Sequence, residues 1–357
     1  MKKTLVIGKG KSGEAAAKAL EDSGASVDFA EGYELVVTSP GVVVKSELQY
    51  GCEELKKRGW KLLAVTGSKG KSSVVKLCAE ALGGTPCGNY GTPVSSLIGG
   101  KPGWAVVEVS SFQLETTTLA PDTFEAAAIL NLQEDHLDRH GGVEVYHQLK
   151  RKLLTFAKTP CTPGTPCTPS APLYAGSYFD NEILSANAEC AVALLRAAGL
   201  ADEKIAAAFR AFKPLPHRFE LVAEKAGIKY IDDSKATSIE ALAAGVKMCG
   251  AGVRLIAGGR AKGDDPASAL PVLTSMVKKV YIIGECAECL HAAWRGEVNC
   301  EICGDLATAV EEAKREARKG ETVLLSPGCA SYDQFKNFGE RGEVFARLVQ
   351  IKGKKTR

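Results

Sequence analysis

The sequence predicts an α/β protein of three domains, in which mostly parallel sheets are covered by helices. Three observations support this prediction. Short apolar runs alternate with helical stretches along the whole chain, which is the pattern of parallel strand–helix–strand units. Two of the apolar runs lead directly into glycine-rich loops. The chain has 357 residues, which is more than one hydrophobic core usually fills.

The predicted elements follow from these runs in chain order. Apolar residues predict strands at 5–7, 35–37, 62–65, 105–107 and 127–130, and then at 229–231, 254–257, 280–283 and 323–325. Helical stretches lie between them at 72–82, 186–198, 306–318 and 335–349. Because helices separate successive strands, we expect parallel strands within each sheet.

Three breaks in this pattern predict the domain organisation. A fresh strand begins after Gly59-Trp60, and Lys213-Pro214-Leu215-Pro216 marks a later boundary. The proline-rich stretch 159–172 excludes helix and central strand, so we expect a surface loop there within the middle domain. The predicted domains are a small Rossmann-like domain at 1–60, a central domain with a mostly parallel sheet at 61–214, and a Rossmann-like domain at 215–357.

Composition limits the possible partners. Hydrophobic residues make up 45% of the chain and charged residues 24%, as in soluble globular proteins. The net charge of +3 gives no support to nucleic-acid or membrane-surface binding. No apolar stretch reaches the roughly 18 residues that a membrane span needs, and no signal peptide precedes the first strand. We therefore expect a cytoplasmic protein.

Twelve cysteines are present, and in a reducing compartment we expect buried thiols rather than disulfides. Four of them, Cys286, Cys289, Cys300 and Cys303, have the spacing C-x2-C-x10-C-x2-C, which is compatible with a four-thiolate zinc site. We favour the alternative that these pairs fall at a helix start and a strand end of an ordinary α/β layer, so zinc is not expected.

Residues 65–73, VTGSKGKSS, predict a phosphate-binding loop between a strand and a helix. Glycines let backbone N–H groups turn toward a phosphate, and the helix N-terminus favours negative charge. Lys71 would reach the β- and γ-phosphates, and the Ser72 hydroxyl could bind Mg²⁺. The strict phosphate-loop pattern has glycine where Val65 stands. The alternative is a glycine turn with a surface lysine.

Gly8, Gly10 and Gly13 form a second glycine-rich turn, G-x-G-x-x-G, between the first strand and a helix. This spacing is the dinucleotide-binding fingerprint, which alone would indicate an NAD-dependent oxidoreductase. A nucleotide-sugar diphosphate can use the same turn. The domain is short for a full dinucleotide fold, so both ligands remain open at this point.

Acidic and histidine side chains follow two of the predicted central strands. Glu108 ends one strand, and His136 lies in the NLQEDHLDRH stretch after another. Ligands of open parallel sheets bind at the carboxyl ends of the strands. Glu108 is therefore a candidate Mg²⁺ ligand, and His136 could serve a second metal or a carboxylate. The alternatives are a solvated acid and a hydrogen-bonding structural histidine.

Several motifs in this order resemble the Mur ligase family. TGSKGKSS, GNYGTPV, EVSSFQLE and NLQEDHLDRH resemble its central domain. LPHRFE, IDDSKATS and LLSPGCASYDQFKNFGERG resemble the C-terminal domain of the branch that adds D-glutamate. GKGKSG near the N-terminus and TSPG at 38–41 are similar to its UDP-binding domain. The resemblance touches all three predicted domains and identifies the central one as a P-loop ATPase domain.

The resemblance implies an ATP-dependent ligase that forms an amide bond in peptidoglycan synthesis. ATP would phosphorylate the carboxylate of UDP-N-acetylmuramoyl-L-alanine, and D-glutamate would attack the acyl phosphate. Two Mg²⁺ ions and lysines would offset the crowding of negative charge. The implied partners are these small molecules alone, and the protein itself would be a monomer.

The resemblance also assigns residues to roles. Catalytic roles fall to Lys71, Glu108, His136, Lys150 and Lys235. ATP contacts fall to Gly67, Ser68, Lys69, Gly70, Lys71, Ser72, Ser73, Arg218 and Asp233. The UDP substrate would contact Gly10, Ser12, Gly13, Asn89, Ser111 and Gln113. D-Glutamate would contact Thr237, Lys262, Ser331 and Phe338. The metal ligands would be Ser72, Glu108, His136 and Lys150.

Lys150 matches the lysine that family members carry as a CO₂ carbamate, which would turn a cation into an anionic metal ligand. The alternative is an unmodified lysine on a helix surface.

The chain departs from the family pattern in its short N-terminal domain, in Ile183-Leu184 in place of a His-Asn pair, and in Asp232 in place of asparagine. Three other functions remain open: a folate-polyglutamate-type ligase, an NAD-binding oxidoreductase, and a non-catalytic binding relative.

Overall fold

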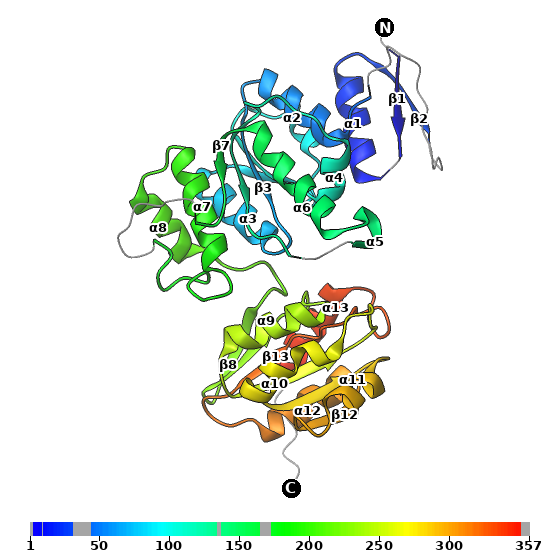
Figure 1. The fold of residues 1–357 in the computed structure, drawn as a ribbon, viewed down its shortest axis with the longest axis vertical. Helices are drawn as coiled ribbons and strands as arrows, with labels where there is room; N and C mark the ends of the chain where they lie inside the picture. The colour runs from blue at the N-terminus through cyan, green and yellow to red at the C-terminus, as the bar shows by residue number, and fades with distance from the viewer. Residues whose placement is uncertain (1–2, 9, 31–43, 134–136, 165–172, 351–357) are drawn as a thin grey trace. The chain divides into compact units, whose positions relative to one another are not determined.

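The computed structural model describes residues 3–8, 10–30, 44–133, 137–164 and 173–350. The chain divides into two compact units, Met1–Phe212 and Lys213–Arg357, which are described separately (Figure 1). Strands form three sheets, two in the first unit and one in the second. This α/β architecture confirms the predicted fold class, and the domain bounds at 60 and 214 remain predictions. No helix in the described ranges is long and apolar enough to cross a membrane.

The N-terminal sheet pairs β1 (Lys3–Ile7) with β2 (Ser26–Ala30) in parallel, and α1 (Lys11–Asp22) is the crossover between them. β1 was expected from its apolar run. β2 was not, because its sequence SVDFA carries an acidic residue at its centre. The strand predicted at 35–37 lies outside the described residues.

The central sheet is parallel throughout and has the order β4-β5-β3-β6-β7. Its members are β3 (Lys61–Thr66), β4 (Thr85–Gly88), β5 (Trp104–Glu108), β6 (Phe124–Ile129) and β7 (Ala157–Cys161). Successive residues of β3 from Leu62 to Val65 are all fully buried. Both faces of the sheet are therefore covered, as the continuous apolar runs predict.

Helices cover the two faces of the central sheet (Figure 1). α2 (Glu47–Lys57), η1 (Val94–Leu97), α4 (Ser111–Thr116) and η2 (Leu153–Phe156) contribute to one apolar cluster. α3 (Lys71–Leu82) packs against α7 (Ser185–Ala197) and α8 (Asp202–Ala211). α5 (Leu137–His140) and α6 (Val143–Lys152) follow β6, and α6 packs on α4.

The expectation of a surface loop from residue 159 was wrong at its start. Residues 157–161 form β7, and the Cys161 side chain is buried. β7 lies at the edge of the sheet, where Pro160 can be accommodated because an edge strand leaves part of its backbone unpaired. Proline excludes a central strand, as expected, but does not exclude an edge strand.

The second unit contains one six-stranded sheet of order β12-β11-β10-β13-β9-β8, parallel except for β8. The strands are β8 (Glu220–Lys225), β9 (Ile228–Asp232), β10 (Val253–Gly258), β11 (Val277–Ile283), β12 (Cys300–Gly304) and β13 (Thr322–Leu325). The predicted central strands are confirmed. The two edge strands, β8 (ELVAEK) and β12 (CEICG), were missed because charged residues interrupt their apolar runs.

Two groups of helices bury this sheet. α9 (Ile239–Cys249), η3 (Pro266–Ala269), α10 (Leu270–Met276) and α11 (Ala287–Trp294) pack on one face, and α12 (Leu306–Glu316) and α13 (Phe338–Gln350) on the other. The prediction that the last helix starts at 335 was wrong. It begins at Phe338 because the Asn337 side chain accepts a hydrogen bond from the Glu340 amide, at 3.0 Å, which caps the first turn.

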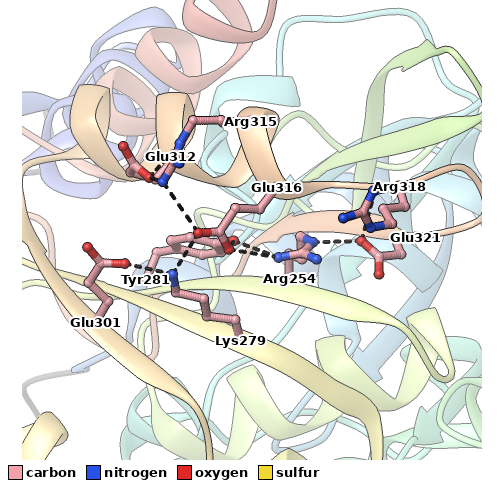
Figure 2. Close-up of polar contacts among 9 residues, drawn as sticks. All are labelled: Arg254, Lys279, Tyr281, Glu301, Glu312, Arg315, Glu316, Arg318 and Glu321. Atoms are coloured by element: carbon pink, nitrogen blue, oxygen red, sulfur yellow. Dashed lines mark hydrogen bonds and ion pairs between the residues drawn. The ribbon is translucent and has the colours of Figure 1, made fainter.

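An ion-pair network links β10, β11, β12 and α12 (Figure 2). Lys279 Nζ lies 2.7 Å from Glu301 and 2.9 Å from Glu316. Arg254 donates to Glu316 at 3.1 Å and to Glu321 at 2.6 Å. Partial burial opposes ionisation of Lys279, but its two carboxylate partners raise its pKa. Glu316 thus joins two cations from neighbouring strands to the end of α12.

The four cysteines considered for zinc do not form a metal-ligating group among the described residues. Cys286 caps the start of α11 and Cys300 begins β12, whereas Cys289 is exposed on α11. The Cys286 sulfur instead lies 3.3 Å from the sulfur of Cys329. The side chains that do come together as potential metal ligands are His217, Glu220 and Asp232.

Candidate active site

A cavity of about 130 Å³ lies in the first unit at the carboxyl ends of β3, β4 and β5. It is lined by Lys71, Asn89, Ser110, Ser111, Phe112, Tyr146 and Lys150. The first five follow strands of the parallel sheet, and the last two come from α6. The cavity therefore occupies the edge of the sheet at which parallel α/β folds bind ligands. Four of the predicted site residues, Lys71, Asn89, Ser111 and Lys150, meet here.

The phosphate loop between β3 and α3 depends on two glycines. Gly67 has φ of 150° and Gly70 has φ of 83°, a left-handed conformation that L side chains rarely adopt. A Cβ atom added to Gly70 would lie 2.2 Å from Nδ2 of Asn187. The turn therefore requires glycine for both its backbone angle and its packing against α7.

Asn131 holds this loop from the end of β6. Its Oδ1 accepts from the Lys69 amide at 2.8 Å, and its Nδ2 donates to the Lys69 carbonyl at 2.9 Å. The same Nδ2 lies 3.1 Å from Oδ1 of Asn187. Ser68 donates to the Gln133 carbonyl at 3.1 Å and accepts from the Gln133 amide at 3.0 Å. The loop is thus preorganised by side chains from two other segments.

Two lysines converge on one carbonyl of the loop. Lys71 Nζ donates to the Gly67 oxygen at 2.8 Å, and Lys150 Nζ donates to the same oxygen at 2.9 Å. Lys150 is only 2% exposed and lies 4.4 Å from the centroid of the Tyr146 ring. The alternative that placed Lys150 on a helix surface is therefore wrong, whereas Lys71 is partly buried at the loop.

Glu108 at the end of β5 is 3% exposed, which contradicts the alternative of a solvated acid. Its Oε1 accepts from Asn89 Nδ2 at 2.8 Å. In the described residues, its Oε2 is buried without a hydrogen-bond partner. A buried carboxylate oxygen of this kind fits a divalent cation, which binds carboxylate and phosphate oxygens. His136, the other predicted ligand, lies outside the described residues.

Ser111 and Gln113 lie at the start of α4. The Gln113 side chain takes part in the cap of α4. Its Oε1 accepts a hydrogen bond from the Ser110 amide at 2.9 Å, and the Ser110 side chain caps the helix in return. The buried Ser111 hydroxyl lies 3.0 Å from Nε2 of His140. Gln113 is thus partly committed to a capping box, whereas Ser111 faces the cavity beside a histidine.

The N-terminal glycines form a tight turn from β1 to α1. Gly8 has φ of 93°, and Gly10 precedes the first residue of α1. A Cβ on Gly13 would lie 1.9 Å from the Gly8 oxygen, so α1 approaches the turn more closely than any other residue type allows. Ser12 is exposed on the first turn of α1.

In the second unit, two adjacent carboxylates end β9. Asp232 Oδ2 lies 2.7 Å from His217 Nδ1, and Asp233 accepts from the Phe219 amide at 3.1 Å and the Ser326 hydroxyl at 2.9 Å. Burial raises the pKa of Asp233 to about 7, and these hydrogen bonds and the charge of Arg218 only partly oppose the rise. Burial also raises the pKa of Asp232.

Of the residues predicted for D-glutamate, Thr237, Lys262 and Ser331 lie on loops of the second unit, and Phe338 begins α13. Lys262 Nζ donates to the Thr237 hydroxyl at 2.9 Å, and Lys235 Nζ lies 4.1 Å from the centroid of the Phe338 ring. Ser331 is buried. Burial lowers the pKa of nearby Arg341 to about 10, and its Nη1 is buried without a hydrogen-bond partner in the described residues.

Several contributing residues were not identified from the sequence. Asn131 and His140 stand within the NLQEDHLDRH stretch, but only the tertiary structure shows that one holds the phosphate loop and the other contacts Ser111. Tyr146 was not identified either, yet its hydroxyl lies 3.1 Å from Ser68 Oγ. Arg341 stands within the NFGERG stretch, and no local signal marks an arginine for burial.

Comparison with known proteins places both units in one family. The family model "Mur ligase middle domain" matches residues 65–161, and "Mur ligase, glutamate ligase domain" matches residues 217–329. The matched segments contain the phosphate loop, the cavity and the adjacent carboxylates of β9.

Curated relatives are similar over almost the whole chain. UDP-N-acetylmuramoylalanine–D-glutamate ligase of Rubrobacter xylanophilus is 35% identical over 438 aligned residues, covering 98% of each chain. The enzyme of the same name from Nitratidesulfovibrio vulgaris is 32% identical over 419, covering 97% of this chain and 95% of the relative. Both alignments are longer than the 357 residues of this chain, so the relatives carry segments that it lacks.

Solved structures show the same fold. MurF ligase of Thermotoga maritima in complex with ADP has a TM-score of 0.65 at 16% identity, covering 97% of this chain and 93% of that one. MurC of the same organism has a TM-score of 0.61 at 15% identity, covering 98% and 99%. FolC of E. coli in complex with DHPP and ADP has a TM-score of 0.60 at 18% identity, covering 87% and 95%. Given these matches and the near-complete coverage of the curated relatives, the chain belongs to the Mur ligase family.

Proposed function

We propose that this protein adds D-glutamate to UDP-N-acetylmuramoyl-L-alanine with hydrolysis of ATP to ADP and phosphate. One observation carries the proposal most directly: the phosphate-loop lysine and the buried Lys150 line one cavity, and the buried carboxylate of Glu108 is hydrogen-bonded to Asn89, which lines the same cavity. The near-full-length similarity to D-glutamate ligases supports the choice of substrates. The chemistry is that of an ATP-dependent amide-bond-forming ligase.

A carboxylate is a poor electrophile, so the reaction begins by transfer of the γ-phosphoryl group of ATP to a substrate carboxylate oxygen. ADP leaves, and an acyl phosphate is formed. The main obstacle is the approach of two anions. Lys71 at the start of α3 can place its ammonium between them, and loop amides can hold the phosphates. Little covalent participation by the protein is needed, so positioning carries most of the catalysis.

Residues of the first unit fit a divalent cation. Ser72, Glu108 and His136 would hold it, and the partnerless Oε2 of Glu108 is the observation that supports this fit. When bound, Mg²⁺ supplies positive charge that neutralises the phosphoryl oxygens. Asn89 orients Glu108 through the hydrogen bond to its other oxygen. That two Mg²⁺ ions bind is part of the proposal.

We further propose that Lys150 carries a CO₂ carbamate and contributes a metal ligand. The ammonium groups of Lys71 and Lys150 share the Gly67 carbonyl oxygen, so as two cations they repel each other in a buried site. Carbamylation would make Lys150 anionic and convert this repulsion into attraction. The buried position of Lys150 supports the modification, because burial disfavours its free ammonium form.

In the second step, the amine of D-glutamate attacks the acyl carbon, and the tetrahedral intermediate collapses with loss of phosphate and a proton. Residues of the second unit would bind the amino acid. Lys262 offers a counter-charge for a carboxylate beside the Thr237 hydroxyl. Ser331, Phe338 and Lys235 are assigned to the same ligand, and Arg218 and Asp233 to ATP. A monomeric state, a cytoplasmic location and the absence of nucleic-acid and membrane partners remain predictions.

The test is phosphate release from ATP and Mg²⁺ with UDP-N-acetylmuramoyl-L-alanine and a panel of amino acids. We expect release that depends on both substrates and is fastest with D-glutamate. Lys71→Ala should lower the rate by about a hundredfold or more, because it removes a charge that acts on the transition state. Lys57→Ala, which changes a lysine with 67% of its side chain exposed on α2, is the matched control.

Fastest phosphate release with a different amino acid, or with a different acid as acceptor, would indicate another ligase activity of the family. Dihydropteroate with L-glutamate is the substrate pair that tests for a folate-type activity. Binding of NAD(H) without binding of ATP would contradict the proposal. Folded protein that binds ATP but gives no product with any pair would indicate the non-catalytic alternative.

A further inference from the structure

Three side chains next to the cavity, Ser111, His140 and Glu115, form a hydrogen-bonded relay. His140, the last residue of α5, has its ring between Ser111 and Glu115. Its Nε2 lies 3.0 Å from Ser111 Oγ, and its Nδ1 lies 3.1 Å from Glu115 Oε1. The His140 side chain is only 1% exposed, whereas Ser111 lines the cavity. Among the described residues, the hydrogen bond from His140 toward the cavity runs through Ser111.

The surroundings determine which ring nitrogen carries the proton. The Glu115 carboxylate accepts hydrogen bonds from Arg139 Nη2 at 2.8 Å and from Arg139 Nε at 3.3 Å. This contact lowers the pKa of Glu115 and keeps the carboxylate ionised. An ionised carboxylate can only accept a hydrogen bond, so Nδ1 of His140 must be the donor. In the neutral imidazole, Nε2 then has a lone pair and accepts the hydroxyl proton of Ser111.

Aromatic packing holds the ring in this orientation. The His140 ring lies 5.4 Å from the ring of Phe112 and 5.4 Å from that of Tyr146, measured between centroids. Both aromatic residues line the cavity. A flip of the ring about its Cβ–Cγ bond would put carbon atoms where the two nitrogens lie and lose the hydrogen bonds to both Ser111 and Glu115. The relay therefore has one favoured direction, from Ser111 to His140 to Glu115.

The direction of the relay sets the chemistry that Ser111 can offer. Its only hydrogen is directed at His140, so toward the cavity it presents lone pairs alone. An acceptor here repels carboxylate and phosphoryl oxygens and attracts an N–H group. Lys71 borders the same cavity and suits the anionic part of a substrate. The cavity thus combines a cation with a neutral acceptor.

We propose that His140 is a positioning residue that fixes the Ser111 hydroxyl as an acceptor, and that this acceptor selects substrates whose reacting carboxylate belongs to an N-acylated amino acid. The amide N–H of such a substrate is separated from its carboxylate by one carbon atom, so it lies beside the group that Lys71 attracts. The inference deepens the proposed function and rests on it for the identity of the substrate. It explains how the site would distinguish an amide from an ester at that position.

The first test does not require turnover. Nitrogen-15 NMR of protein labelled at histidine, compared with the His140→Gln spectrum for assignment, reports which ring nitrogen is protonated. We expect the His140 signals of a neutral ring with hydrogen on Nδ1. Hydrogen on Nε2, or on both nitrogens at neutral pH, would overturn the proposal even if the protein is an active ligase.

The second test uses a substrate in which L-lactate replaces the alanyl residue, so that an ester oxygen stands in place of the N–H. We expect the wild-type protein to prefer the amide in kcat/KM by about tenfold to a hundredfold, the range for one lost hydrogen bond. Ser111→Ala should reduce this preference to near one. An unchanged preference in Ser111→Ala would contradict the assigned acceptor.

Variants at position 140 separate positioning from folding. His140→Phe removes the acceptor of the Ser111 proton and should raise the KM of the amide substrate about tenfold, with the KM of ATP unchanged. His140→Gln can accept that proton with its side-chain oxygen and should recover most of the loss. His147→Phe is the matched control, because His147 also packs on Tyr146, with ring centroids 5.8 Å apart, but does not contact Ser111 in the described structure.

Equal losses in His140→Phe and His140→Gln would indicate a merely structural role and overturn the proposal. If no substrate pair supports turnover, the proposed function fails, and the same amide–ester comparison is made by equilibrium binding. Equal binding of the amide and the ester by wild-type protein would then refute the selection by Ser111, whereas preferred binding of the amide would support it without catalysis.

Discussion

The adjacent carboxylates of β9 predict a specific dependence of stability on pH. Burial raises the pKa of Asp233 from 3.8 to about 7 in the folded protein. The folded state therefore holds a proton on this group over a range in which the unfolded chain has lost it. The stabilisation is complete below pH 4 and is lost as the pH rises to about 7. A difference of about three pKa units corresponds to about 4 kcal/mol, as an upper estimate.

Asp233→Asn removes this dependence while retaining an acceptor for the Phe219 amide. The free energy of unfolding of the variant, relative to wild type, should increase by up to about 4 kcal/mol between pH 4 and pH 8. Urea unfolding can be followed by the fluorescence of the buried Trp294 in the second unit, after Trp60 and Trp104 are changed to phenylalanine in both proteins.

Asp122→Asn, which changes an exposed carboxyl of the first unit, is the control and should show no such trend. The neighbouring Asp232 titrates in both Asp233→Asn and wild type, so its contribution cancels to first order in the difference. A relative free energy that stays flat from pH 4 to pH 8, or that falls as the pH rises, would refute the argument that burial dominates at Asp233.

Three further predictions concern the other parts of the structure. Gly70→Ala should raise the KM of ATP at least tenfold, because the added Cβ would lie 2.2 Å from Asn187; an unchanged KM would show that the loop can shift. Glu316→Gln should destabilise the second unit by about 2 kcal/mol, since Lys279 loses a partly buried partner; urea unfolding measures this, and a loss below about 0.5 kcal/mol would place the pair among ordinary surface ion pairs. Removal of bicarbonate should lower activity, and ¹³C-bicarbonate should give a carbamate resonance that is absent from Lys150→Arg; a resonance that persists in the variant would exclude this lysine.

The sequence predicted the fold class and the strands with continuous apolar runs, since these strands are buried on both faces. It also placed Glu108 and the phosphate loop at one edge of the sheet, because parallel strands bring their carboxyl ends together. It missed β2, β4, β7, β8 and β12, all of which lie at sheet edges, because edge and partly exposed strands lack that apolar signal. Position in a sheet, which the local pattern does not encode, decides whether a proline such as Pro160 can be accommodated.

Within the candidate site, the phosphate-loop motif joins neighbours in sequence, and its Lys71 lines the cavity; the role of Ser72 stays a prediction. Two residues that act through tertiary contacts were not found. His140 reaches Ser111 across 29 residues of chain, and Asn131 reaches Lys69 across 62. Such contacts depend on how helices pack on the sheet. No spacing rule indicates which histidine or asparagine faces inward.

The shared carbonyl of Gly67 has a consequence for the order in which the site forms during synthesis. The Gly67 carbonyl accepts a hydrogen bond from Lys150, which lies 83 residues later in the chain. Gly70 packs against Asn187 of α7. A nascent chain that has exposed only the first three strands of the central sheet has the glycines but none of their supports. The phosphate loop should therefore gain its part of the nucleotide affinity once α7 has left the ribosome and folded onto the sheet. Until then, we expect that an incomplete chain does not sequester ATP.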